Sequence, residues 1–304
     1  MHGLLMLVVS WTGSSNEIAA PEYAPAPPPS STFQIEHSFV HTLKSQKLQR
    51  SYDVYVKLPP GYDEPENAHR VYPVVYFNDG PYTFTVAAGV SGVPMRHDTF
   101  DEFILVGFSY AQGEDSMISR ERDLTPWTDL RNKPHVTGGA RAYLDFLQDE
   151  AMPFVEKTYR IDARRRTLAG QSYGALFGIW VLFTEPGLFQ NYILTSPSLW
   201  YNRRAIFANE ASFAAAHTDL KATIYFAIGA NEHPAPCGRD VAECSNEDMV
   251  GDQSAMLKQL RSRHYPNLKL HAKVVDGAYH TTTFPIGLLW ALQDLFLSHR
   301  LERK

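Results

Sequence analysis

Residues 170–174 read Gly-Gln-Ser-Tyr-Gly, and this stretch decides the fold. It has the pattern G-x-S-x-G, it follows a short strand-like run at 166–169, and it precedes the apolar segment 175–183, which is typical of a buried helix. A strand, a sharp turn that carries serine and then a helix make a nucleophile elbow. In that turn the serine backbone is strained, and side chains in place of the two glycines would clash with the neighbouring strand and helix. The stretch therefore predicts Ser172 as a catalytic nucleophile.

Segments with the pattern of strands occur on both sides of the elbow. Residues 33–40 and 52–58 alternate polar and apolar side chains, which predicts an antiparallel pair of strands at a sheet edge. Residues 72–77 and 103–108 are continuous apolar runs, which are typical of buried parallel strands. Strand-like segments at residues 166–169, 192–195, 223–228 and 270–275 continue the series.

Between these strands lie segments in which the apolar residues have helical spacing. This spacing begins at Gly139, where Pro153 is expected to kink or restart the helix, and it recurs at residues 249–260 and 285–296. Alternating strands and helices predict an α/β fold, with a mostly parallel, twisted sheet and helices on both faces. Together with the elbow, this three-layer sandwich is the architecture of an α/β-hydrolase.

A serine hydroxyl needs a base that removes its proton, and in this fold the acid and then the histidine follow the serine along the chain. His280 lies between the last predicted strand and the last helix, so we expect it to be the base. Glu232 comes just after the strand at 223–228 and is predicted to orient the His280 ring. Asp240, in the same loop, and Asp276, close to His280 in sequence, stay open as alternatives for the acid.

Two backbone amides are needed to stabilise the oxyanion of a tetrahedral intermediate. Tyr173 directly follows the nucleophile and is expected to supply one of them. Asn-Asp-Gly at residues 78–80 ends the third strand, and this loop, with Asp79 and Gly80, is expected to supply the other. Gly80 would let the backbone turn close to the substrate carbonyl, although an ordinary turn explains the triplet equally well.

Aromatic and basic residues near strand ends are candidates for binding the substrate, because ligands of open α/β sheets bind beyond the carboxyl ends of the strands. Arginines there would suit an anionic substrate, whereas exposed arginines usually have no specific partner. The candidates are Trp200, Tyr201, Arg203 and Arg122. We expect no metal, since His37 and His41 lack a third ligand and the acidic residues between 243 and 252 lack the spacing of a calcium loop.

The composition is ordinary for a globular enzyme, with 44% hydrophobic and 20% charged residues in a chain of 304. A net charge of −5 gives no indication of nucleic-acid binding. Cys237 and Cys244 are too few for a tetrahedral zinc site, and in an exported protein they would form a local disulfide. We expect no cofactor, and the composition leaves the oligomeric state open.

The first residues have the character of a targeting segment. Residues 4–9 form an apolar run that is too short to span a membrane and resembles the core of a signal peptide without its positive leader. Five prolines between residues 21 and 29 indicate a polyproline-like linker. We therefore predict a signal-like segment and linker at 1–32, a single domain at 33–304 and no stable membrane insertion. Export to the periplasm or outside the cell is expected, with a cytoplasmic location as the alternative.

Several stretches resemble the esterase family that includes enterochelin (siderophore) esterases and esterase D. The resemblance runs from about residue 51 to the C-terminus, and the block from the elbow to Trp200 is the most specific part. The family more often has histidine at the position of Gln171, and it usually has glycine where Tyr173 or Ala175 stands. The stretches are residues 74–80, 120–126, 138–140, 146–150, 166–174 and 196–200.

The resemblance implies an α/β-hydrolase with a serine–histidine core that cleaves esters and, in some members, siderophore trilactones. The elbow, the predicted base and the predicted acid lead to the same hypothesis. The protein is expected to be a serine esterase that uses Ser172, His280 and Glu232 on a small-molecule ester. Siderophore esters, acetylated or feruloylated sugars and simple acyl esters are all compatible substrates. Two other hypotheses stay open: an acyltransferase, in which an alcohol or thiol replaces water, and a non-catalytic binding module that kept the fold.

Overall fold

The computed structural model describes residues 31–129, 135–234 and 247–298. The chain divides into two compact units, Met1–Gln34 and Ile35–Lys304, and the fold below is that of the second unit. The predicted signal-like segment, the cysteine pair and Asp240 lie outside the described residues, so they stay predictions. In the part of the chain that is described, no helix has the length and apolar character needed to cross a membrane.

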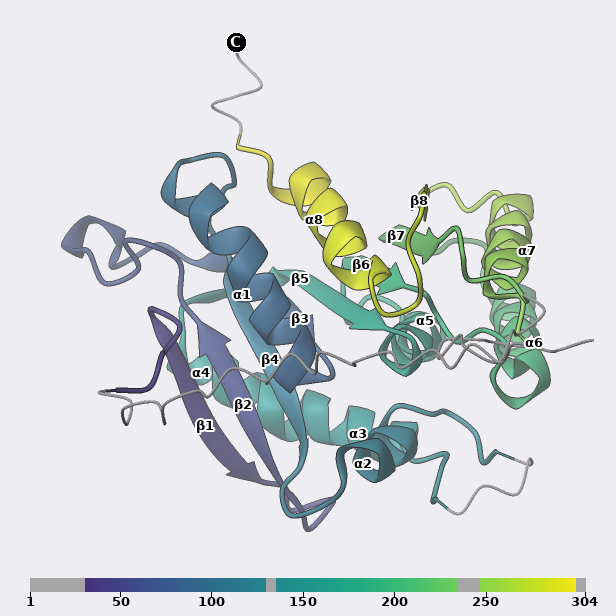
Figure 1. Ribbon diagram of the computed structural model, residues 1–304, viewed down its shortest axis with the longest axis horizontal. Helices are drawn as coiled ribbons and strands as arrows, with labels where there is room; N and C mark the ends of the chain where they lie inside the picture. The colour runs from purple at the N-terminus through teal and green to yellow at the C-terminus, as the bar shows by residue number, and fades with distance from the viewer. Residues whose placement is uncertain (1–30, 130–134, 235–246, 299–304) are drawn as a thin grey trace, which may run out of the picture. The chain divides into compact units, whose positions relative to one another are not determined.

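A single sheet forms the centre of this unit. Its strands, as far as the chain is described, are β1 (Ser38–Lys44), β2 (Ser51–Lys57), β3 (Tyr72–Phe77), β4 (Ile104–Ala111), β5 (Ile161–Gln171), β6 (Asn191–Thr195), β7 (Ala222–Gly229) and β8 (Leu268–Val275). They are ordered β1-β2-β4-β3-β5-β6-β7-β8 (Figure 1). β2 pairs antiparallel with β1 and with β4, and the other pairs are parallel. The predicted antiparallel edge pair is thus confirmed, although β1 begins at Ser38 rather than at residue 33.

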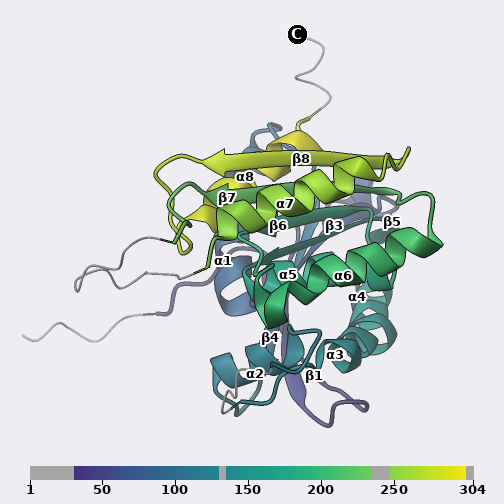
Figure 2. The ribbon, with the colours of Figure 1, turned by 90° about the vertical axis from the view of Figure 1, so that its right-hand side faces the viewer.

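Helices cover both faces of the sheet. They are α1 (Gly80–Arg96), α2 (Ser116–Asp123), α3 (Ala140–Phe146), α4 (Met152–Thr158), α5 (Tyr173–Thr184), α6 (Tyr201–Ala216), α7 (Met249–Ser262) and α8 (Thr283–Phe296), with the short turns η1 (Pro65–Asn67) and η2 (Leu147–Ala151). α1 and α8 pack on one face, and α3 to α7 pack on the other (Figures 1 and 2). Pro153 lies in the first turn of α4, where the helical segment restarts as expected. The predicted three-layer α/β sandwich is confirmed.

The central strand β3 serves both hydrophobic layers. Val74 and Tyr76 belong to the core beneath α3 to α7, whereas Val75 and Phe77 belong to the core beneath α1 and α8. Successive side chains of a strand point to opposite faces. A strand that is covered on both faces must therefore be apolar at every position, and all six residues of β3 are buried.

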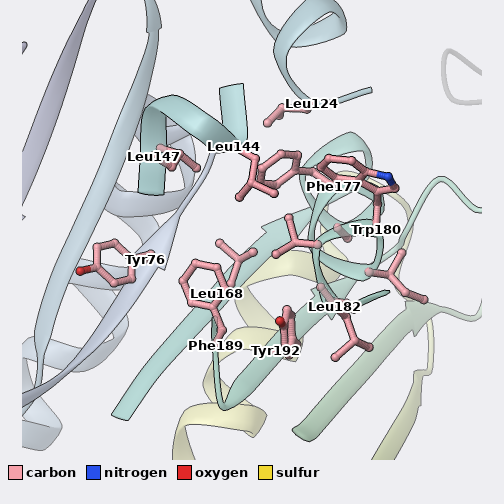
Figure 3. Close-up of a cluster of buried hydrophobic side chains, with 14 of the residues drawn as sticks. Tyr76, Leu124, Leu144, Leu147, Leu168, Phe177, Trp180, Leu182, Phe189 and Tyr192 are labelled. Carbon is pink, nitrogen blue, oxygen red and sulfur yellow. The ribbon is translucent and has the colours of Figure 1, made fainter. Parts of the chain in front are cut away.

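The helix after the elbow is held by the larger of these two cores. Every residue of α5 from Tyr173 to Phe183 is buried. Figure 3 shows Phe177 and Trp180 of α5 in one cluster with Leu168 and Tyr192 from the strands beneath. Burial of apolar surface stabilises by roughly 25 cal/mol per Å². This packing fixes the start of α5, and with it the position of the preceding serine.

The parallel strands end at one edge of the sheet. β3, β5, β6, β7 and β8 point in the same direction, so the segments that follow them leave from the same side. Those segments carry the residues named above for catalysis: Asp79, Ser172, Glu232 and His280. The carboxyl edge of an open α/β sheet is where ligands bind in this class of fold.

Candidate active site

Ser172 lies at a strained turn between β5 and α5. Its backbone has φ 57° and ψ −115°, a conformation that residues with a side chain rarely adopt. A Cβ atom on Gly170 would lie 2.4 Å from the carbonyl carbon of Gly174, which is closer than any real contact. A Cβ on Gly174 would lie 3.1 Å from Oδ2 of Asp79. Gly170 is therefore required by close packing, as the G-x-S-x-G pattern predicts, and Gly174 is packed tightly against the Asp79 side chain.

A buried carboxylate orients the predicted base. The Oε2 atom of Glu232 lies 2.8 Å from Nδ1 of His280. The other oxygen, Oε1, accepts hydrogen bonds from the Ser196 hydroxyl at 2.7 Å, the Gly229 amide at 2.7 Å and the Thr283 hydroxyl at 2.9 Å. Glu232 is only 4% exposed. These bonds to Oε1 hold the carboxylate with its other oxygen, Oε2, toward the imidazole.

The ionisation of Glu232 reflects this environment. Burial alone would raise the pKa of Glu232, because it penalises the charged form. The hydrogen bonds from His280, Ser196 and the Gly229 amide favour the charged form more strongly, so the pKa lies below its ordinary value. Glu232 is therefore ionised at neutral pH and can stabilise a protonated His280.

The two alternative acids have different positions. Asp276 lies exposed in the turn after β8, at a point where water solvates its carboxylate. Asp240 lies outside the described residues. The geometry thus brings Glu232, rather than Asp276, into contact with His280.

Ser172 and His280 face the same cavity, which has a volume of about 250 Å³. The hydroxyl oxygens of Ser172 and Ser198 lie 3.1 Å apart, within hydrogen-bond distance. The side chain of His280 is 37% exposed, so its ring is open to a ligand on the cavity side. The cavity is lined by Ser172, Ser198, Trp200, Asn231, Glu232, His233, Met249, Tyr279, His280 and Thr281.

The predicted oxyanion amides lie at the starts of two helices. Tyr173 is the first residue of α5, and Asp79 and Gly80 form the start of α1. The N-terminus of a helix carries positive partial charge and attracts anions. The close approach of Asp79 to Gly174 brings the start of α1 against the elbow.

The structure gives a packing reason for glycine at position 80, and the expected approach to the substrate carbonyl stays a prediction. A Cβ atom there would lie 2.7 Å from the main-chain oxygen of Phe108 and 2.9 Å from the Tyr55 ring. Gly80 is therefore required because β4 passes close to the start of α1. The left-handed residue of the turn is Asp79, with φ 58° and ψ 40°.

Arg120, which we did not predict as a site residue, connects the two helix starts. Its Nε donates to Oδ1 of Asp79 at 2.7 Å, and its Nη2 donates to the main-chain oxygen of Gln171 at 3.2 Å. Its guanidinium carbon lies 5.1 Å from the centre of the Tyr173 ring, a cation–π distance. Burial alone would lower the pKa of Arg120, but the nearby Asp79 carboxylate raises it by more. The pKa therefore lies above its ordinary value, and the guanidinium stays charged.

The predicted substrate-binding residues have different surroundings. Trp200 lines the cavity at Ser172. Tyr201 is fully buried, and its hydroxyl donates to the main-chain oxygen of Trp127 at 2.9 Å.

The two predicted arginines do not line this cavity, and Arg203 is exposed. Arg122 pairs with Glu114 and with Asp123.

The chain next to Trp200 makes a left-handed turn. Asn202, Arg203 and Arg204 have φ values of 47°, 57° and 62° in succession. Left-handed helical geometry costs roughly 1–2 kcal/mol for each residue that has a side chain. Arg204 Nε forms an ion pair with Oδ1 of the buried Asp252 at 2.6 Å, which ties the turn to α7.

No metal centre is apparent among the residues that the structure describes, since their His, Cys, Asp and Glu side chains form no group of three suited to an ion.

A strained serine that follows a central parallel strand, and a histidine paired with a buried carboxylate at the same edge of the sheet, define an α/β-hydrolase. Residues 45–281 match the sequence model of the family described as "Putative esterase". The chain belongs to this family.

Named relatives agree with this assignment. The ferri-bacillibactin esterase BesA of Bacillus subtilis is 30% identical over 185 residues, which cover 57% of this chain and 63% of BesA. The siderophore enterobactin esterase of Emericella nidulans is 34% identical over 170 residues, which cover 48% of this chain and 55% of that protein. The matches thus span between about half and two thirds of these relatives.

A solved structure extends the similarity to most of the chain. The IroE-like serine hydrolase from Shewanella oneidensis superposes with a TM-score of 0.72 and 25% identity. The superposition covers 85% of this chain and 80% of that protein. This level of similarity supports the α/β-hydrolase fold that the sheet order indicates.

Proposed function

We propose that this protein is a serine esterase that hydrolyses carboxylic esters through an acyl-enzyme intermediate. The observation that carries the proposal is the contact of His280 with the buried Glu232 in the same cavity as the strained Ser172. Membership of the esterase family supports it. The reaction needs no group other than these side chains, two backbone amides and water.

In the first half-reaction, the Oγ atom of Ser172 attacks the ester carbonyl carbon, and Nε2 of His280 takes the serine proton. Glu232 stabilises the positive imidazolium through its contact with Nδ1. The carbonyl oxygen becomes an oxyanion, which the backbone amides at the starts of α1 and α5 stabilise. His280 then gives its proton to the leaving alcohol, and the acyl group remains on Ser172.

In the second half-reaction, His280 takes a proton from water, and the resulting hydroxide attacks the acyl carbonyl carbon. The carbon–oxygen bond to Ser172 breaks, and the serine oxygen regains its proton from His280. Arg120 contributes by holding Asp79 and the Gln171 carbonyl, because these contacts fix the start of α1 against the elbow.

We extend the proposal to siderophore-type esters as the substrate class. Two named relatives are siderophore esterases, and this supports the assignment. A second hollow of about 280 Å³ adjoins the elbow at Gln171 and is lined by Tyr82, Tyr110, Met117 and Arg120. With two hollows at the elbow, the site has room for an ester that carries a bulky aromatic group on one side.

The first test measures hydrolysis of p-nitrophenyl acetate, butyrate and octanoate by the purified protein. We expect activity that Ser172→Ala lowers at least about 1,000-fold, because the nucleophile is lost. Ser212→Ala, which removes an exposed hydroxyl on α6, is the matched control and should leave the rate unchanged. A fluorophosphonate should label the wild-type protein and not Ser172→Ala.

The second test separates substrate classes. Chromatography of a ferric trilactone siderophore after incubation with the protein should show opening of its ester bonds. If an added alcohol acquires the acyl group in place of water, the protein is an acyltransferase. Absence of both ester hydrolysis and fluorophosphonate labelling would refute the proposal and favour a binding module.

A further inference from the structure

Gln171, the variable residue of the elbow, reaches across to the loop that carries the base. It is the last residue of β5, directly precedes Ser172 and is only 7% exposed. Its side-chain Nε2 donates a hydrogen bond to the main-chain oxygen of His280, 109 residues further along the chain. The nucleophile and the base are thereby linked through the side chain of the residue next to the serine.

The loop between β8 and α8 is held at its base, where the Asn231 amide donates to the main-chain oxygen of the buried Ala278 at 3.1 Å. Asp276, Gly277 and Tyr279 are exposed between β8 and α8. The Tyr279 amide donates to the Thr282 hydroxyl at 2.9 Å, which is a contact within the loop itself. The bond from Gln171 adds a link from the main chain of His280 itself to the end of the central strand β5.

The position of His280 is fixed at two points that serve different purposes. Glu232 contacts Nδ1 and so determines the orientation of the ring about its own axis. Gln171 holds the main-chain oxygen and so determines where the backbone places the ring. The Gln171 backbone is itself held, since its oxygen accepts a hydrogen bond from Arg120.

We propose that Gln171 is a positioning residue that sets the distance between His280 and Ser172, and this rests on the proposed esterase function. The role requires a hydrogen-bond donor at the end of the side chain, because the atom it meets is a carbonyl oxygen. Glutamine meets this requirement, and histidine can meet it through a ring N–H. An ionised glutamate and a leucine have no donor at all.

The test compares three substitutions of this residue. Gln171→Glu has the same shape but an acceptor in place of the donor, Gln171→Leu removes polarity, and Gln171→His restores a donor. We expect kcat at pH 8 to fall about 10-fold or more in the Glu and Leu variants, with KM within about threefold of the wild type. Gln171→His should retain at least about a third of the wild-type kcat.

A spectroscopic measurement separates positioning from general stability. In wild-type protein with 15N-labelled histidine, the proton on Nδ1 of His280 should give a low-field resonance, which His280→Ala identifies. We expect this resonance to broaden or disappear in Gln171→Glu while the unfolding midpoint changes little. Gln293→Leu, which removes an exposed amide from α8, is the matched control.

The outcomes distinguish the two proposals. A wild-type protein without esterase activity would refute the proposed function, whatever the variants do. An active wild type with Gln171→Glu and Gln171→Leu within twofold of its kcat would refute the role of Gln171 alone. If Gln171→Leu does not fold, the isosteric Gln171→Glu decides between these outcomes.

Discussion

The hollow that contains Ser172, at the carboxyl edge of the parallel sheet, differs in kind from the hollow at the amino edge. The one at the carboxyl edge measures about 250 Å³ and contains the strained Ser172 and the buried Glu232. The one at the amino edge is larger, at about 660 Å³, and its lysines, Lys221 and Lys269, are exposed. Size therefore does not mark the functional hollow, whereas backbone strain and a buried charge do.

Helix direction explains why the chemistry lies at the smaller hollow. At the carboxyl edge, α1 and α5 begin, and their N-terminal amides present positive partial charge. At the amino edge α5 and α6 end, at Thr184 and Ala216, and present carbonyl oxygens. A developing oxyanion is stabilised by the first arrangement and repelled by the second.

The largest expected effect comes from the acid of the carboxyl edge. Glu232→Gln should lower kcat about 1,000- to 10,000-fold, because an amide neither stabilises the imidazolium nor selects the correct tautomer of His280. Steady-state hydrolysis of p-nitrophenyl butyrate measures this. Glu185→Gln, which alters a surface ion pair with Arg141, is the matched control. A loss smaller than 10-fold would contradict the assignment of Glu232 as the acid.

The same carboxylate should give the protein an acid-sensitive stability. The folded-state pKa of Glu232 lies below its ordinary value of 4.5. Its stabilising contribution is therefore complete above pH 4.5 and is lost as the pH falls below 4.5 toward the folded-state pKa. Urea unfolding between pH 7 and pH 3 should show a steeper loss for the wild type than for Glu232→Gln. Parallel curves for the two proteins would show that the pKa is not lowered.

The smallest effect is expected at the amino edge. Replacing Lys221 and Lys269 together by alanine should leave kcat/KM within about twofold of the wild type, because surface substitutions away from a site change little. The same assay, with siderophore and simple esters in turn, measures it. A change of more than about fivefold would give the larger hollow a part in catalysis and remove the contrast between the two edges.

Local patterns predicted much of the site. The elbow, the base and the acid all depend on a strand followed by a short loop. The strands before the elbow and the acid are readable because their buried segments are apolar, whereas β8, before the base, is largely exposed and was placed by its position ahead of the last helix. Helix α1 escaped prediction because Gly89, Gly92 and Pro94 interrupt its sequence, and these residues usually mark turns. Tertiary packing of Phe84 and Ala87 against the sheet overrides that preference.

The choice between two arginines could not be made from sequence. Arg120 and Arg122 both lie on α2, and residues two apart on an α-helix point about 200° apart. We expected Arg122 at the substrate, but the structure turns Arg120 toward the elbow and Arg122 toward Glu114 and Asp123. The side of a short polar helix that faces the site depends on how the helix packs against the rest of the protein. A segment with as few apolar residues as α2 has no hydrophobic pattern that would predict this packing.

The left-handed turn at Asn202–Arg204 bears on how this pocket can diversify. A position held at positive φ accepts glycine or asparagine readily and rejects β-branched residues. The backbone conformation therefore limits which residues can replace Asn202, Arg203 or Arg204, whatever the substrate. We therefore expect the specificity of the cavity to change more easily through Trp200 itself, or through exchange of the entire turn together with Asp252. Single substitutions within the turn are less favourable.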